Sequence, residues 1–245
     1  MVEIMTGRFE SWDAVNVASD LLSCPLYGFA RVDALLRLPQ GTARRWIDGY
    51  NRRDKHYPPV VRPETTGIDI VTWGEFVEAK LLSGYRSKGV AMLRMRPVVE
   101  RLREQSGSLY PLATGHLFVA NKELVARVQE EVGLDEPLRL VVVRTGQLAF
   151  SRVVEQFMDQ VDWQTESEDG EEITARVLPL GKSSPVAIDP RRSFGEPVVG
   201  AVRTAVIAEE FRAGESLQAV ADGFALSIRE VNEAIRFELT RLEAA

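Results

Sequence analysis

The sequence has few of the side chains that build disulfides and metal centres. Its 245 residues include one cysteine, Cys24, and two histidines, His56 and His116. A single cysteine cannot form an internal disulfide, and cysteine and histidine do not occur at the spacing of a zinc site. The longest apolar runs are too short to cross a bilayer, and residues 1–7 have no basic stretch leading into an apolar one. We therefore expect a cytoplasmic protein with no metal, no cofactor and no membrane contact.

The motifs of common enzyme classes are missing as well. No G-x-x-x-x-G-K loop, H-E-x-x-H helix or G-x-S-x-G elbow occurs, and Cys24 has no evident partner base. His56 lies in a basic segment, where a phosphate or surface contact is the better interpretation, and His116 is typical of a turn. Neighbouring carboxylates such as Glu171 and Glu172 point in different directions. The sequence therefore predicts a protein that is not an enzyme.

The net charge of −6 is spread unevenly along the chain. Residues 28–105 contain 15 Lys and Arg against 9 Asp and Glu, which gives +6. Residues 1–27 sum to −3, residues 106–193 to −5 and residues 194–245 to −4. With 45% apolar and 27% charged residues, the chain can bury a core. A basic module on an acidic body is typical of a protein that meets an anionic polymer with one part only.

Residues 27–105 have the pattern of two helices around a tight turn, followed by a hairpin and two more helices. Apolar residues at helical spacing precede Pro39, and a second helix starts near Gln40. Paired prolines, a glycine and β-branched residues between positions 50 and 73 predict a short hairpin or wing. Two further helices are expected, over residues 72–85 and 94–104.

The middle region has short β-rich runs between helices. The runs cover residues 109–120, 138–150 and 173–180, and the helices are expected over residues 123–132 and 151–160. The acidic stretch 166–172 is typical of a solvated loop. These patterns predict a small α+β region.

The last part of the chain predicts three helices. The first covers residues 204–212, Ser216 can cap the second, and Ser227 with Glu230 forms an S-x-x-E capping box for the third. Apolar residues repeat along the third helix at Ile228, Val231, Ile235 and Leu239. This stripe is either the core of the domain itself or a surface for self-association or partner binding.

The basic module carries the residues that a DNA-reading helix needs. Such a helix enters the major groove with polar and guanidinium side chains near its N-terminus, and the candidates are Gln40, Thr42, Arg44 and Arg45. Candidate phosphate contacts, which position a protein without reading sequence, are Arg52, Arg53, Lys55 and Arg62. Trp46 is expected to anchor the helix on the core. The alternative is a solvated pair of amphipathic helices with incidental arginines.

This segment resembles the N-terminal winged helix-turn-helix of the MerR family. The matching residues are Tyr27, Val32, Leu35, Leu36, Leu38, Thr42, Arg44, Arg45, Trp46 and Tyr50. Residues 71–104 look like the third and fourth helices of that family. The resemblance implies a DNA-binding module over residues 28–105. The long dimer coiled coil and the effector domain of MerR activators have no counterpart in the sequence.

The C-terminal part is similar to a small helix-turn-helix domain found in antitoxins of the VapB class. Its matching residues are Phe194, Gly195, Pro197, Gly200, Arg203, Thr204, Gly214, Ser216, Ala221, Phe224, Val231, Ala234 and Ile235. The combination of both parts resembles large VapB-type antitoxins paired with a PIN-like RNase toxin. The resemblance implies a type II antitoxin that covers or perturbs the acidic site of its toxin and represses the promoter of its own operon.

The fold expected from these patterns and resemblances is α+β and mainly helical. An N-terminal extension (1–27) precedes the winged helix-turn-helix (28–105), the β-containing middle region (106–190) and a C-terminal three-helix helix-turn-helix (191–245). The acidic C-terminal part is a poor DNA reader, so toxin binding or dimerisation is its better use. The candidate partner contacts are Arg191, Arg192, Arg203, Ile228, Val231, Ile235 and Leu239.

Three functions remain open at this stage. The first is an antitoxin that binds a toxin and operator DNA, and a homodimer of it would place two modules about 34 Å apart on an inverted repeat. The second is a stand-alone MerR-like transcription regulator without a toxin. The third is a protein-interaction scaffold whose basic module docks on an acidic partner.

Overall fold

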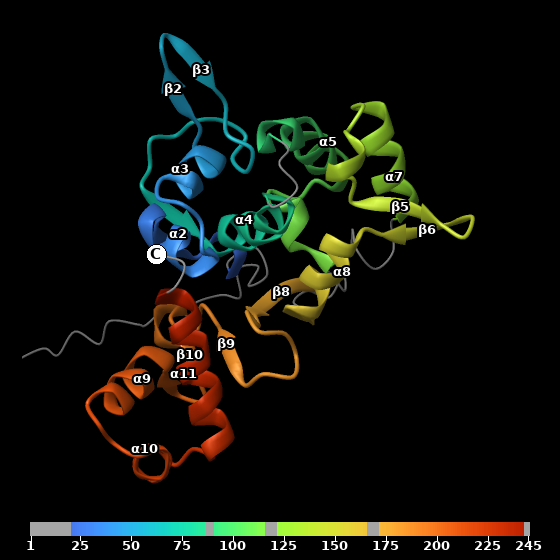
Figure 1. The fold of residues 1–245 in the computed structure, drawn as a ribbon. Helices are drawn as coiled ribbons and strands as arrows, with labels where there is room; N and C mark the ends of the chain where they lie inside the picture. Colours follow the sequence, from blue (N-terminus) through green and yellow to red (C-terminus); the bar gives the residue numbers. More distant parts are fainter. Residues whose placement is uncertain (1–20, 87–90, 116–121, 166–171, 243–245) are drawn as a thin grey trace, which may run out of the picture.

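The computed structural model describes residues 21–86, 91–115, 122–165 and 172–242, which form an α+β fold with several small sheets. Figure 1 shows the arrangement of the elements. The N-terminal elements are β1 (Pro25–Gly28), α2 (Phe29–Leu36), α3 (Thr42–Ile47), β2 (Tyr50–Arg52), β3 (Lys55–Tyr57), β4 (Ile70–Thr72), α4 (Trp73–Tyr85) and α5 (Arg96–Ser106). The expected helix over 94–104 thus begins two residues later, after a 3-10 turn at Met92–Met95.

The turn between α2 and α3 is held by a buried carboxylate. Helix α2 ends at Arg37, which has a left-handed backbone (φ 54°). Asp33 is only 4% exposed, and its carboxylate accepts hydrogen bonds from the N–H groups of Gly41 (2.6 Å) and Ala43 (2.7 Å). Because these N–H groups lie at the start of α3, the carboxylate satisfies donors that the helix cannot pair itself. The angle between the two helices is therefore fixed locally.

Helix α4 lies at the centre of the larger core. The Thr72 and Glu75 capping box starts it, and Trp73, Phe76 and Tyr85 are fully buried. The indole N–H of Trp73 donates to the Thr174 carbonyl at 2.7 Å. Among the described residues, one cluster of buried apolar side chains extends from Leu21 to Ile188. The middle region therefore packs on the N-terminal module and shares its core.

The middle region contains most of the predicted elements. The elements observed there are α7 (Lys122–Glu131), β5 (Val141–Arg144), β6 (Gln147–Phe150), α8 (Arg152–Asp159), β7 (Val161–Thr165) and β8 (Glu172–Val177). The expected β-rich run over 109–120 is wrong for its first half, where Pro111–Ala113 is a 3-10 turn and Thr114 makes one isolated bridge. The reason is tertiary, because this turn packs on α4 and the Leu112 N–H donates to the buried Glu78 carboxylate at 2.9 Å. Residues 116–120 of this run lie outside the described residues.

A five-stranded antiparallel sheet joins the middle region to the C-terminal part. Its order is β11-β10-β9-β8-β7, and only β8 was expected from the sequence. The strands that were not expected are β7 and also β9 (Val186–Ile188), β10 (Pro197–Val199) and β11 (Val202–Arg203). Strand β10 pairs with β9 through Val198 and Ala187. The sheet is therefore continuous across residue 190.

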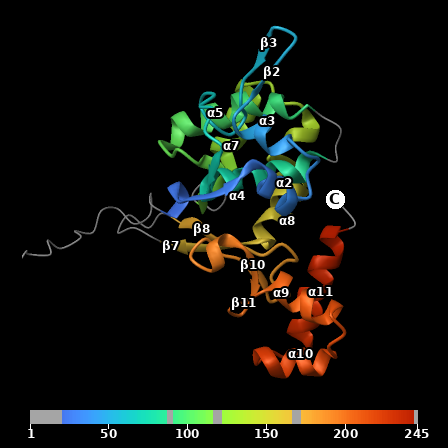
Figure 2. The same cartoon turned by 90° about the vertical axis from the view of Figure 1, so that its left-hand side faces the viewer.

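The C-terminal helices are α9 (Thr204–Arg212), α10 (Leu217–Phe224) and α11 (Ile228–Leu242). The Ser216 hydroxyl accepts from the Ala219 N–H, and the Ser227 and Glu230 capping box is present, as the sequence predicts. These helices surround a second core with Val186 and Val199 of the sheet. Figure 2 shows that the β2–β3 hairpin and α10 lie at opposite ends of the molecule, in agreement with Figure 1. None of the described helices has the length and apolar character of a membrane span.

Candidate functional site

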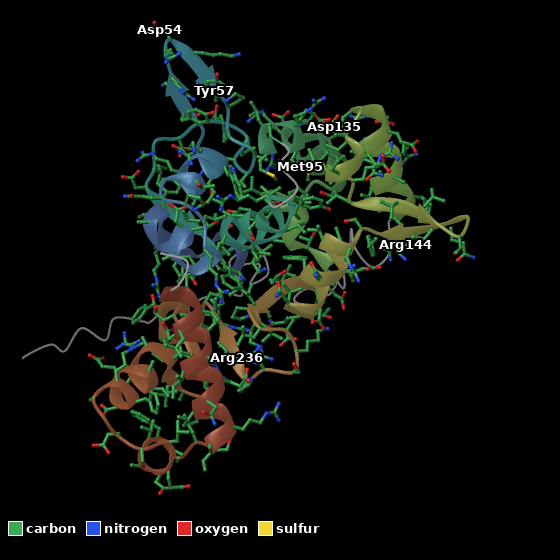
Figure 3. All side chains as sticks on the ribbon, in the orientation of Figure 1. Asp54, Tyr57, Met95, Asp135, Arg144 and Arg236 are labelled. Atoms are coloured by element: carbon green, nitrogen blue, oxygen red, sulfur yellow. The ribbon has the colours of Figure 1, made fainter. Side chains whose placement is uncertain are left out.

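The β2–β3 hairpin projects from the N-terminal end and carries a concentration of positive charge. Its two loop residues, Arg53 (φ 49°) and Asp54 (φ 60°), both have left-handed backbones, which is the geometry of a type I′ hairpin turn. Figure 3 shows Asp54 at the tip and Tyr57 nearer the base. The rings of Tyr50 and Tyr57 stack at 4.6 Å with 3° between their planes. This stacking stiffens the hairpin, whose arginine and lysine side chains are exposed.

Helix α3 exposes two of the predicted DNA contacts and buries a third. Arg44 and Arg45 are exposed, as is Gln40 in the turn before the helix. Thr42 is 5% exposed, and its hydroxyl accepts from Arg45 Nη2 at 2.9 Å. Thr42 therefore orients an arginine, and its side chain is not open to a base.

Arg44 has an intramolecular partner that the sequence did not reveal. Its guanidinium lies 5.3 Å from the centre of the Phe29 ring and 2.9 Å from the carboxylate of Asp69. Both charged side chains of this pair are more than half exposed. An approaching phosphate would therefore compete with Asp69 for Arg44.

Arg62 is not the surface phosphate contact that the sequence predicts. Only 6% of it is exposed, and it donates to the carboxylates of Asp48 (2.8 Å) and Glu75 (2.6 Å) and to the carbonyls of Ile68 (2.9 Å) and Ile70 (2.7 Å). Burial disfavours its charge, but the hydrogen bonds to both carboxylates outweigh this effect and keep the pKa of Arg62 above its ordinary value. Arg62 is a structural ion-pair centre that holds the loop after β3 against α3.

The apolar stripe of α11 divides into a buried and an exposed half. Val231 is fully buried and Ile235 is 8% exposed, and both belong to the C-terminal core. Ile228 and Leu239 are 44% and 52% exposed. The stripe is therefore used largely inside the domain, and only its two outer residues are open to a partner.

The three candidate arginines of the C-terminal part are exposed on two segments. Arg191 Nη1 donates to Gln164 at 2.8 Å, and its Nε lies 3.3 Å from the buried Asp189 carboxylate. Arg192 lies 3.8 Å from the same carboxylate. Arg203 is on β11, opposite Val198 of β10. Arg191 and Arg192 thus share one turn.

Contacts between the N-terminal module and the C-terminal part form a joint that sequence reasoning missed. The Tyr27 hydroxyl donates to the Gly195 carbonyl at 2.6 Å, Arg31 pairs with Glu196, and Arg37 donates to the Thr240 hydroxyl at 2.7 Å. Burial, followed by the nearby Glu196 charge, raises the pKa of the Tyr27 hydroxyl far above its ordinary value, so it stays a donor. These partners are more than 160 positions apart, and no local pattern connects them.

The residues that the structure describes contain no group of three or more His, Cys, Asp or Glu side chains that could hold a metal. Cys24 is a free thiol, and His56 Nδ1 lies 2.8 Å from the Asn51 amide oxygen on the hairpin. His116 and most of the acidic stretch 166–172 lie outside the described residues.

Comparison with known proteins finds relatives and a solved structure from Mycobacterium tuberculosis. "Uncharacterized protein Rv2308" is 35% identical over 236 residues, which cover 93% of this chain and 97% of the relative. "Putative antitoxin VapB45" is 31% identical over 226 residues, which cover 86% of this chain and 92% of the relative. The crystal structure of Rv2018 matches with a TM-score of 0.68 and 30% identity, over 86% of this chain and 97% of that one.

No family model matches the chain. The identities of 35% and 31% extend over nearly the full length of both relatives and are not confined to a short motif. The chain therefore belongs to the protein family of Rv2308 and VapB45, whose second member is named as an antitoxin.

Proposed function

We propose that this protein is the antitoxin of a type II toxin–antitoxin system, which neutralises a PIN-like RNase toxin by direct binding and represses its own operon. The observation that carries the proposal is the 31% identity to a relative with an antitoxin name, over 92% of that relative. The protein acts without catalysis and without a cofactor. It binds its operator and its toxin in the cytoplasm.

The DNA-binding half of the proposal rests on the exposed cations at the N-terminal end. Helices α2 and α3 with the β2–β3 hairpin act as a winged helix-turn-helix, in which α3 enters the major groove. Gln40, Arg44 and Arg45 read base edges, since an arginine donates two parallel hydrogen bonds to a guanine. Arg52, Arg53 and Lys55 on the hairpin contact phosphates. Thr42 orients Arg45, and the buried Arg62 holds the loop after β3 against α3.

The toxin-binding half rests on the C-terminal part of the chain. Residues 194–245 carry a charge of −4, which disfavours DNA there. The exposed candidates for partner contacts are Arg191, Arg192, Arg203, Ile228 and Leu239. In a homodimer, two N-terminal modules contact successive major grooves of an inverted repeat.

The test combines partner capture with operator binding. The full chain is co-expressed with the product of the neighbouring gene in its operon, and the native mass and RNase activity of the purified complex are measured. A stoichiometric complex in which the RNase activity disappears supports the antitoxin. DNA binding is measured with the promoter fragment of the operon at two salt concentrations, and the affinity must fall steeply with salt.

A double variant tests the reading helix. Arg44→Ala with Arg45→Ala is expected to lose the preference for the operator and to bind it at least about 10-fold more weakly. The matched control is Arg212→Ala with Arg236→Ala, which removes two exposed arginines from α9 and α11. Retention of the same site preference by the first variant would show that α3 is not the reading helix.

The second candidate is a stand-alone MerR-like regulator that uses the same arginines of α3 without a toxin. It is favoured if the neighbouring gene product does not bind and only DNA binding and self-association are observed. The C-terminal part would then serve dimerisation alone.

A further inference from the structure

The turn between β9 and β10 holds an aromatic side chain out of the molecule. Phe194 is 88% exposed, which makes it the most exposed large apolar side chain in the described part of the chain. The next is Val143, at 71%. A single exposed apolar residue needs no explanation. What distinguishes Phe194 is the backbone that carries it.

Three consecutive residues of this turn have left-handed backbones. The φ angles are 47° for Ser193, 55° for Phe194 and 70° for Gly195. This conformation suits glycine, whereas serine and phenylalanine adopt it at a cost in free energy. Residues held in such conformations cluster at functional sites, where the surrounding structure enforces them.

The surrounding structure does enforce the turn. The N–H of Arg192 donates to the Asp189 carbonyl (3.0 Å), that of Gly195 to the Arg192 carbonyl (2.9 Å) and that of Glu196 to the Ser193 carbonyl (3.1 Å). The buried Asp189 carboxylate accepts from the Arg191 N–H at 2.9 Å. The Tyr27 hydroxyl fixes the far end of the turn through the Gly195 carbonyl. The backbone that carries Phe194 is therefore fixed before binding, so that only its side chain loses conformational entropy when a partner binds.

Positive charge flanks the exposed ring. Arg191 and Arg192 precede Phe194 on the same turn, and their side chains are 48% and 60% exposed. Their intramolecular partner, Asp189, is shared between them. A rigid aromatic anchor beside two arginines has the composition of the energetic centre of a protein interface.

We propose that the turn 189–196 is the docking element for the toxin, with Phe194 inserted in an apolar pocket whose rim carries carboxylates. This inference rests on the proposed antitoxin function and names the contact that function needs. The occupant follows from charge complementarity, because the two flanking arginines select an acidic rim.

The test uses a substitution that removes the ring and keeps the turn. Phe194→Asn retains a residue that tolerates the left-handed conformation, so the melting temperature is expected to stay the same or rise. The dissociation constant for the co-purified product of the neighbouring gene is expected to increase at least about 30-fold. Phe194→Leu keeps an apolar side chain and is expected to lose less affinity than Phe194→Asn.

Two controls accompany this variant. Val143→Asn removes the other strongly exposed apolar side chain, on the β5–β6 hairpin, and is expected to leave the affinity within about 2-fold. Arg191→Gln with Arg192→Gln is expected to weaken binding and to reduce its dependence on salt, because it removes the charges that the rim recognises.

Four outcomes decide the matter. If the wild-type protein does not bind the neighbouring gene product, both the proposed function and this inference are contradicted. If the wild-type protein and Phe194→Asn bind the neighbouring gene product with equal affinity, the docking inference is overturned and the proposed function stands. Loss of binding with a melting temperature several degrees lower assigns Phe194 a structural role and also overturns it. If Phe194→Asn changes the native mass of the free protein and leaves the toxin affinity unchanged, Phe194 contacts a second copy of this chain and not the toxin.

Discussion

Arg62 and Asp48 hold the segment 63–70 against the C-terminal end of α3. Asp48 accepts from the N–H groups of Thr66 (2.8 Å) and Gly67 (3.0 Å) as well as from Arg62. Burial raises the pKa of Asp48, but these donors outweigh burial and bring the pKa below its ordinary value. The carboxylate is therefore charged at neutral pH, and its partner cannot be removed without leaving that charge uncompensated.

We expect Arg62→Met to lower the free energy of unfolding by about 3–5 kcal/mol, because it leaves two buried carboxylates without their cation. Urea denaturation followed by circular dichroism measures the change. The control is Arg52→Met on the exposed hairpin, with a change within about 0.5 kcal/mol. An Arg62→Met midpoint equal to that of wild type would refute the structural role.

A second residue-level prediction concerns Asp69, which competes with phosphate for Arg44. Asp69→Asn frees the guanidinium, and we expect operator affinity to rise about 2- to 5-fold, the range of an exposed ion pair. Fluorescence anisotropy with the operator measures it. Asp222→Asn on α10 removes one negative charge at the far end of the molecule and controls for net charge. Equal gains for both variants would mean that Arg44 is not involved.

Glu78 of α4 gives a prediction with a defined pH dependence. It is fully buried, and burial raises the pKa of its carboxyl to about 8, against the opposing hydrogen bond from the Leu112 N–H. The folded state thus holds a proton that the unfolded state releases near its ordinary pKa of about 4.5. The unfolding free energy contributed by this group is present below about pH 4.5 and is lost as the pH rises toward 8.

Glu78→Gln keeps the acceptor for Leu112 and removes the titration. Each unit of difference in pKa corresponds to about 1.4 kcal/mol. We expect wild type to lose at least about 1 kcal/mol of unfolding free energy relative to Glu78→Gln between about pH 5 and pH 8. Parallel pH profiles of the two proteins would show that the carboxyl is ionised in the folded state.

At the scale of elements, Gly195 allows β1 and the turn before β10 to meet. Its φ is 70°, and a Cβ added there would collide with the Tyr27 hydroxyl and the Leu26 side chain. Gly133 has a similar φ of 62° with open space around it. Comparing alanine substitutions at these two glycines therefore separates two contributions to the loss of unfolding free energy. One is the steric clash of the new side chain, and the other is the left-handed backbone conformation.

We expect Gly133→Ala to cost about 1 kcal/mol of unfolding free energy, the penalty of a left-handed alanine. Gly195→Ala adds the loss of the Tyr27 hydrogen bond and a backbone shift, so its cost is expected to be at least twice as large. Thermal and urea unfolding of both variants provide the comparison. Similar costs for the two would mean that the joint can relax around a methyl group.

At the scale of the whole molecule, the basic module depends on residues far along the chain. Helix α4 is buried on all sides, and its contacts to Thr174 and to Arg139, whose carbonyl accepts from the Tyr85 hydroxyl at 3.1 Å, come from the middle region. We expect a fragment of residues 21–105 to lack the near-ultraviolet circular dichroism and the cooperative unfolding transition of the full chain, because it exposes this core. A cooperatively folded fragment would show that the module is autonomous.

Local patterns predicted much of the secondary structure. The limits of α9 agree with the sequence prediction, the β2–β3 hairpin lies within the segment 50–73 in which a hairpin is predicted, and Ser216 caps α10 as expected. In each of these cases the deciding hydrogen bonds join residues a few positions apart. The 3-10 turn at 111–113 escaped prediction because its partner Glu78 is 34 positions away in the sequence. Strands β9 to β11 escaped because they have only two or three residues each, too few for an alternating pattern.

The candidate site divides in the same way. The sequence alone determined the basic character of residues 28–105, the exposed arginines of α3 and the cationic hairpin, because charge and helical spacing are local properties. Only the tertiary structure decided that Arg62 is buried, that Asp69 faces Arg44 and that Phe194 stands exposed on a strained turn. Burial and backbone strain depend on groups such as Glu75 and Tyr27 that long-range packing brings into contact, and no local pattern encodes that packing.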